Sequence, residues 1–497
     1  MLTAQTAPAV PVARHVEGDR ALRALGLALP PVLALYALFD KGFAYIHIPR
    51  TPVFPGEVVV GLALLVVVVA TTYVRRGLRG AWSMPFLGLF VAWGAVRLLP
   101  ELPVYGLDSV RDSALWYYAL VAVGVVALCA AWPDLPERWA RWYGFLIPVL
   151  LVWSILALGL LRLNSPQIPD SHVSAFSHNP GNIAVQVVIA MSFLWLVPMR
   201  SALSRYRVAL LALGATLLFV VGTQNRGGLV AAIIGLGLCL VLARDRLRLF
   251  GALVGAMALL LVVAWAADVH IPGGQGGREV STAQLAQNIG SLTGGGGTQG
   301  ALASNIAWRD QLWAAAVSTT MARGQVLNGW GFGPNIAQAL GFQGSENPPL
   351  RSPHNSHVDV FTRMGLIGSV LWVLFWLTWF AHMLRARTRL RGPGDQVRRA
   401  LLGVILVGVT ATLVNAYFDP TLETPPVAIW LWTLVGLGVG LAVPAMARRD
   451  PTPARRDHVL PVTGPGRRQV WSQAMVETST EATTEPAAIA QAAPLTP

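Results

Sequence analysis

The residue types best suited to chemistry are histidines and arginines that stand beside apolar segments. His354, Asn355 and His357 lie in SPHNSHVD (352–359), where an apolar run begins. Arg226 lies in TQNRGGL (223–229) and Arg309 in AWRDQLW (307–313). An arginine fork suits phosphate oxygens and stays charged, and a neutral imidazole can accept a proton as a general base. This set suits attack by a hydroxyl on a substrate whose leaving group is a lipid-linked diphosphate.

A helix is expected to begin near Ser356, with Ser356 and Asp359 as a capping box. Its N-terminal end carries a partial positive charge, which favours an anion. The same field lowers the pKa of a neighbouring histidine. We therefore predict that His354 is neutral near pH 7 and can accept a proton.

A second histidine competes for this role. His178 lies in AFSHNPGNIAVQ (175–186) and, like His354, is followed by an asparagine. Asn182, after Pro180 and Gly181, is expected to cap the next helix. The residues alone do not choose between His178 and His354 as the base.

Each candidate also has a structural interpretation. Arg226 could extend to the membrane interface, and Arg309 could be an ordinary loop arginine. His357 could pack at the interface. Arg363 could pair with Asp359, one helical turn earlier. A metal site of His354, His357 and Asp359 has loose spacing and is disfavoured.

The composition excludes a soluble protein. The 497 residues are 54% hydrophobic and only 12% charged, with a mean hydropathy of +0.55, against about 25% charged in soluble domains. Apolar blocks of about 17 to 25 residues are long enough to span a bilayer. They predict an all-α polytopic membrane protein of about twelve transmembrane helices, near 23–40, 57–74, 82–98, 113–131, 144–162, 180–198, 207–224, 228–243, 248–267, 357–383, 400–418 and 426–446.

The net charge of +13 lies largely in connections between these blocks. Cytoplasmic loops of membrane proteins are enriched in arginine and lysine, so the charge does not indicate nucleic-acid binding. Residues 73–80, 137–141, 200–207, 243–248 and 385–399 are basic, and the alternate connections are not. This pattern predicts that both termini are cytoplasmic.

The predicted organisation is one transmembrane domain over 21–446 with disordered tails at 1–20 and 447–497. The long connection 268–356 falls on the external side and is expected to be a folded lid, because structureless loops of this length are uncommon. Residues 301–325 are expected to be helical, with Trp308 and Trp313 near the interface. Residues 328–335 are expected to form a tight glycine turn.

The sequence resembles the O-antigen ligase and polymerase superfamily. HNSHVDVFTRMGLIG (354–368) is similar to the signature of that family. Further segments resemble its other motifs in the same order, namely KGFAYIHIP (41–49), NPGNIA (179–184), NRGGL (225–229), WRDQLW (308–313) and GWGFG (329–333).

The resemblance implies a C-type membrane glycosyltransferase fold and a reaction without metal or cofactor. A glycan would pass from undecaprenyl diphosphate to an acceptor hydroxyl outside the bacterial cytoplasmic (inner) membrane. His354 would be the base, and Arg226 and Arg309 would hold the diphosphate. The candidate substrate-binding residues are Asn355, Asn182, Asn225, His357, Arg363 and Trp313.

The sequence leaves several functions open. A ligase would use a lipid, protein or glycan acceptor, and a polymerase would use the carrier-linked glycan itself. A transporter or flippase should place ionisable residues near the membrane midplane on broken helices. In this sequence the polar clusters flank the apolar blocks at the external side, which favours the enzyme over a transporter or a non-catalytic scaffold.

Overall fold

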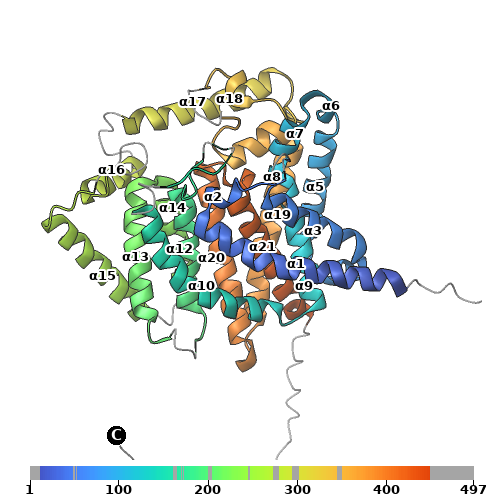
Figure 1. The fold of residues 1–497 in the computed structure, drawn as a ribbon. Coiled ribbons are helices and arrows are strands. Elements are labelled where there is room, and N and C mark those ends of the chain that lie inside the picture. Colours follow the sequence, from blue (N-terminus) through green and yellow to red (C-terminus); the bar gives the residue numbers. More distant parts are fainter. Residues whose placement is uncertain are drawn as a thin grey trace, which may run out of the picture. The chain divides into compact units, whose positions relative to one another are not determined.

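The structure is a computed structural model that describes residues 12–48, 51, 53–159, 165–169, 171, 173–199, 204–243, 247–271, 279–293, 301–343 and 350–447. Its described part is helical apart from two isolated β-bridges (Figure 1). The predicted C-terminal tail lies almost entirely outside these residues. α1 begins at Val12, so residues 12–20 belong to a helix and not to a disordered tail.

Every apolar block named above coincides with one or two helices. The helices that form the bundle are α1 (Val12–Phe39), α3 (Pro55–Val69), α4 (Thr71–Leu78), α5 (Met84–Leu98), α7 (Leu107–Asp112), α8 (Ala114–Tyr117), α9 (Leu120–Ala131), α10 (Leu135–Leu158), α12 (Pro180–Leu196), α13 (Arg207–Gln224), α14 (Arg226–Leu242), α15 (Leu247–Ala266), α19 (Ser356–Arg389), α20 (Gln396–Phe418) and α21 (Pro425–Ala447). Further helices lie in the connections between them: α2 (Lys41–Ala44), α6 (Leu102–Tyr105), α16 (Thr282–Thr293), α17 (Ala301–Ala322) and α18 (Ile336–Ala339).

The chain is a multi-pass helical membrane protein. Among the described residues, six helices are long and apolar enough to cross a membrane, in α1, α10, α13, α19, α20 and α21. The bent pairs α3–α4 and α7/α8–α9 raise the number to eight. The predicted number of twelve is not confirmed: α15 is described only in part, and α5, α12 and α14 have only 15 to 17 residues. At 1.5 Å per residue they extend about 23 to 26 Å, short of the roughly 30 Å hydrocarbon core.

Helix α12 lies at the centre of the bundle. Every one of its residues is buried, and it packs against α13, α14 and α20. Glycines allow close approach between these helices, as is usual in membrane bundles. A Cβ at Gly235 of α14 would meet Val188 and Ala411, and one at Gly408 of α20 would meet Ile189.

The basic connections gather at the end of the bundle where α19 finishes. Arg398 pairs with Glu137 at 2.5 Å. Arg387 donates to the carbonyl of Leu242, and Arg389 donates to that of Met446. These contacts join the end of α19 to the ends of α14 and α21, and the start of α20 to the start of α10. The basic connections next to these contacts therefore lie at the same end of the bundle, in agreement with the alternation of basic and non-basic connections along the sequence.

The lid, residues 268–356, lies at the other end of the bundle, where α19 begins (Figure 1). It contains α16, α17 and α18, and α17 packs against α19. The predicted lid helix is present, but its tryptophans pack inside the protein. Trp308 contacts the rings of Phe342 and His354, and the Trp313 indole donates to the carbonyl of Pro353 at 2.7 Å.

The lid also completes a break in α19. Gly365 has φ 66° and ψ −164°, which interrupts the helix. Residues 326–331 of the lid bond the backbone groups at the break: Trp330 N donates to Thr362 O (2.7 Å), Gly331 N to Arg363 O (3.0 Å) and Leu366 N to Val326 O (2.7 Å). The predicted glycine turn is present, with positive φ at Gly329, Gly331 and Gly333. The first part of α19, residues 356–364, is therefore held as a separate short helix.

Candidate active site at the lid end

Three bundle helices, α12, α14 and α19, begin with an asparagine cap at the lid end. Asn179 accepts from Gly181 N (2.8 Å), Asn225 from Gly228 N (2.7 Å), and Asn355 from both His357 N (3.0 Å) and Val358 N (3.1 Å). These bonds satisfy amides that a helix start leaves unpaired.

Two predicted caps are therefore wrong. Asn182 lies in the first turn of α12, because Pro180 occupies the first helical position, where its missing N–H is no loss. Ser356 and Asp359 do not form a capping box, because Asn355 supplies the cap of α19 and Asp359 pairs with Arg363.

The three capped helix starts surround the end of α20. Asn225 donates to the Asp419 carboxylate (3.4 Å), and Ser356 Oγ to the Asp419 carbonyl (3.4 Å). A Cβ at Gly181 would meet Asn415 and Asp419. The start of α14 is equally close, since a Cβ at Gly227 would meet Phe418 at 2.6 Å. The N-terminal partial charges of α12, α14 and α19 thus converge on one place, which favours an anion.

Cationic side chains also lie at these helix starts, near Asp419 at the end of α20. Arg226 is the first residue of α14 and donates to Ser291 of α16 (3.3 Å). Arg309 extends from α17, donates to the carbonyl of Phe418 and faces the Asp419 carboxylate at 3.7 Å. Its side chain is 31% exposed, so it remains open to a ligand. Burial raises the pKa of Asp419 above the ordinary carboxyl value, and this opposes a permanent charge on the partner of Arg309.

Lys41 is a site residue that the sequence reasoning did not propose. Its charge acts on His354, Asp419 and Asp40 together. It is the only lysine in a chain that otherwise uses arginine. That isolation, together with its position at the end of the first apolar block, was the available signal.

His354 lies beside these cations in an unusual conformation. Its φ of 54° is in the left-handed region, which few residues other than glycine adopt and which is frequent at functional sites. Its Nδ1 is buried and has no hydrogen-bond partner within the described part of the chain. Burial, followed by the charges of Arg309 and Lys41, lowers its pKa to about 4. The predicted lowering is present, although burial and not the helix field is its largest cause.

This pKa has a measurable consequence. Because kcat/KM reports ionisations of the free enzyme, its pH profile should stay level from pH 7.5 to about 5 and fall about tenfold per unit below a midpoint near pH 4. The sign follows from the base being active only when neutral. Initial rates of carrier diphosphate release across this range would measure it. A midpoint near pH 6.5 would show that an unshifted histidine is the base.

The other two candidate histidines, His178 and His357, make different contacts. The ring nitrogens of His178 face the carbonyls of Phe176 (3.0 Å) and Leu38 (2.7 Å), so neither is open to take a proton from a substrate. His357 lies against the Leu413 carbonyl (3.0 Å) and accepts from the Trp372 indole (3.2 Å). His354, His357 and Asp359 thus have separate surroundings, and no metal-ligating group of three such residues is found in the described ranges.

Two asparagines carry unpaired polar atoms at the site. Asn355 Nδ2 and Asn182 Oδ1 are buried and have no hydrogen-bond partner among the residues described. Buried polar groups are nearly always paired, so such atoms call for an explanation, and a ligand provides one. The Asn182 amide donates to Asp40 (2.9 Å), which also accepts from Asn179 N (2.6 Å). Asp40 is a second residue that the sequence reasoning missed.

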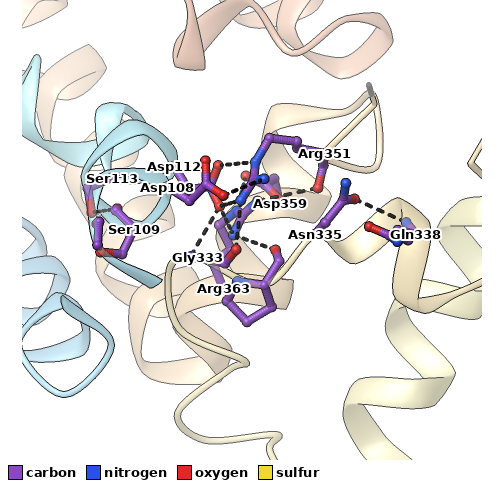
Figure 2. Close-up of polar contacts among 12 residues, drawn as sticks. Asp108, Ser109, Asp112, Ser113, Gly333, Asn335, Gln338, Arg351, Asp359 and Arg363 are labelled. Carbon is purple, nitrogen blue, oxygen red and sulfur yellow. Dashed lines mark hydrogen bonds and ion pairs between the residues drawn. The ribbon is translucent and has the colours of Figure 1, made fainter. Parts of the chain in front are cut away.

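Arg363 belongs to the support of the site (Figure 2). It pairs with Asp359 at 3.0 Å, as the ion-pair interpretation anticipated, and also with Asp112 of α7 at 3.1 Å. Arg351 pairs with the same Asp112 at 3.0 Å. This network fixes α19 and the segment that precedes His354 to α7. Trp313 acts similarly through Pro353, so both residues position His354 and are not placed to contact a substrate directly.

The fold defines a multi-pass helical membrane protein, and comparison with known families implies a glycosyltransferase-like membrane enzyme. Residues 210–373 match the protein-family model described as O-antigen ligase. The matched segment contains Arg226, Arg309 and His354. It confirms the predicted resemblance to the O-antigen ligase and polymerase superfamily. No curated protein matches the sequence significantly.

Proposed function

We propose that the protein transfers a glycan from undecaprenyl diphosphate to an acceptor hydroxyl at the outer face of the bacterial cytoplasmic membrane, as a surface-polysaccharide ligase. The observation that carries this proposal is the imidazole of His354. It is partly enclosed, has its pKa lowered to about 4, and lies beside Arg309 and Lys41. A neutral base next to a strongly cationic place suits a hydroxyl nucleophile and a diphosphate leaving group.

The proposed reaction is a single displacement. His354 Nε2 accepts the proton of the acceptor hydroxyl, since Nδ1 is enclosed. The acceptor oxygen then forms a bond to the anomeric carbon. The bond from that carbon to the diphosphate oxygen breaks, and the carrier diphosphate leaves with the electron pair, which inverts the anomeric centre. His354 afterwards releases its proton to solvent.

The cations stabilise the leaving group. Arg226 and Arg309 offer planar pairs of donors to the phosphate oxygens, and Lys41 adds a point charge. Asn355, Asn182 and Asn225 are proposed to orient the substrate, since their polar side chains lie around the same place. No step in this scheme requires a metal or a cofactor.

The membrane arrangement follows from the same features. We place the basic end of the bundle in the cytoplasm, with both termini there, and the lid outside. The lipid of the carrier then stays in the bilayer while its diphosphate reaches the helix starts at the lid end. A polymerase would use the same residues with a carrier-linked glycan as the acceptor, and is the alternative.

The test uses the full-length protein in lipid nanodiscs, given a synthetic undecaprenyl-diphosphate oligosaccharide and a panel of lipid, glycan and carrier-linked acceptors. Release of carrier diphosphate is measured for the parent, Arg226→Lys and Arg309→Lys. Each variant should lower kcat by about 10- to 100-fold, because lysine keeps the charge but loses the fork, and one oxyanion donor contributes about 10²–10³.

Arg138→Lys is the matched control, because Arg138 is exposed and lies at the start of α10 in the basic end. It should keep the parent rate. Full activity of both site variants would remove the diphosphate clamp from the proposal. The acceptor that is consumed separates ligase from polymerase.

A further inference from the structure

A cleft of about 620 Å³ opens between α6 and the lid, away from the helix starts that surround Asp419. Its volume is in the range of small-ligand sites. The lining residues that bear on its chemistry are Glu101, Tyr105, Arg323, Gln325, Asn335 and Gln338. In Figure 1, α6 and α14 lie on different sides of the bundle, so this cleft is separate from the proposed diphosphate site.

The cleft presents planar polar groups with free bonding capacity. Three amides, one carboxylate and one guanidinium line it, and each can bond two neighbouring groups of a ligand. Gln325 Oε1 is buried and unpaired among the described residues. Asn335 uses its Oδ1 to accept from Gln338 N (3.0 Å), so its Nδ2 donors are not used by this cap (Figure 2). Such a set fits the adjacent hydroxyls of a sugar ring.

An aromatic face completes the lining. Tyr105 is 41% exposed and offers a flat apolar surface with a polar tip, on which the C–H face of a sugar ring can lie. Trp330 serves a different purpose, because it is buried, donates to Thr320 (2.9 Å) and carries Arg323 over its ring at 4.1 Å. The open aromatic surface is therefore that of Tyr105.

The charge balance excludes a phosphate as the main ligand. Glu101 and Arg323 are the only charged residues lining the cleft as described, and they have opposite signs. The site around His354 differs, because Arg226, Arg309 and Lys41 gather there. A nearly neutral cleft rich in amides suits a neutral polyhydroxyl compound better than a diphosphate.

We propose that this cleft binds the neutral saccharide part of a glycan substrate, a few sugar rings away from the bond that reacts. The inference rests on the proposed glycosyl transfer. The wall of the cleft is bonded to the segment that carries His354 (Figure 2). Gly333 O accepts from the Arg351 side chain (2.6 Å), and Ile336 N donates to Arg351 O (3.1 Å). Pro334 O accepts from the Arg363 side chain (3.5 Å). Arg351 lies three residues before His354, so a bound saccharide is held on the same support as the base.

The test measures binding by the full-length protein in nanodiscs. The probe is the carrier-free oligosaccharide released by mild acid from the lipid-linked glycan of the source cells. Ala339→Trp fills the cleft from an exposed position and should weaken binding at least about tenfold. Gln338→Ala removes an amide, and Glu101→Gln replaces one acceptor oxygen of the carboxylate with an NH2 donor. Each should weaken binding about three- to tenfold.

The matched control is Gln287→Ala, which removes an exposed amide from α16 outside the cleft and should bind like the parent. Inorganic pyrophosphate should bind the cleft variants and the parent equally. The proposal is overturned if the parent does not bind the oligosaccharide or if Ala339→Trp binds it as tightly as the parent.

Kinetics then identify the source of the saccharide. A KM that rises in the cleft variants for the lipid-linked donor alone assigns the cleft to the donor glycan, and a rise for the acceptor alone assigns it to the acceptor. A rise for neither overturns the proposal. If the parent releases no carrier diphosphate but oligosaccharide binding still follows the variants, the proposed transfer fails and the saccharide cleft stands.

Discussion

His354→Ala is expected to lower kcat for carrier diphosphate release by about 10²–10⁴-fold, the usual contribution of a general base. The KM for the donor should stay within about threefold of the parent value, because the diphosphate contacts come from Arg226, Arg309 and Lys41 and an interaction made only in the transition state affects kcat. Initial rates with saturating and limiting donor would measure both quantities.

His354→Asn separates the loss of the base from backbone strain. Asparagine tolerates the positive φ at this position better than most residues, so this variant keeps the local fold but cannot accept a proton. It should be as inactive as His354→Ala. His270→Ala, an exposed lid position, should retain the parent rate. Parent-like turnover by His354→Asn would exclude His354 as the base.

Arg363→Met is expected to lower the free energy of unfolding by about 3–5 kcal/mol, the range measured when one member of a buried ion pair is removed. Arg363 is 1% exposed and contacts Asp359 and Asp112, so its loss leaves the buried Asp359 carboxylate without its cation. Denaturation in mixed micelles, followed by tryptophan fluorescence, would measure the loss. Activity should fall as well, because the network holds the segment before His354.

The double variant Arg363→Met with Asp359→Leu tests the cause. It removes the unpaired carboxylate together with the cation and should recover most of the lost stability, since apolar replacements of buried pairs are often neutral. Arg398→Met is the matched control, because its pair with Glu137 is partly exposed and should contribute less than about 1 kcal/mol. A loss at Arg363→Met as small as at Arg398→Met would show that the network does not hold the site.

The sequence predicted the helices well because apolar blocks must be helical in a bilayer, where every backbone group needs an internal partner. Each of the expected blocks is helical in the structure. The number of full spans was harder to predict, because α12 and α14 are short helices and α12 is apolar for a different reason. Every residue of α12 is buried within the bundle. Hydropathy does not distinguish burial in protein from burial in lipid.

The N-terminal boundaries of helices α12 and α19 were predicted less accurately. Helix α12 is capped by Asn179, three residues before the expected Asn182. Helix α19 is capped by Asn355, one residue before the expected Ser356. Both alternatives fit general capping preferences. The choice depends on which side chain reaches the free amides in the folded protein, and sequence spacing does not fix that geometry.

The sequence by itself determined which chemistry is available: His354 next to Asn355, arginines at helix ends, and a long connection between two apolar blocks. Only the tertiary structure decided which of these residues meet. Asp112 and Arg351 are 239 positions apart, and Lys41 lies far from His354 along the chain, so no local pattern joins them. The structure also shows that the two histidines have different surroundings, because both ring nitrogens of His178 face backbone carbonyls, whereas His354 Nδ1 has no hydrogen-bond partner among the described residues. The packing around each ring decides this difference.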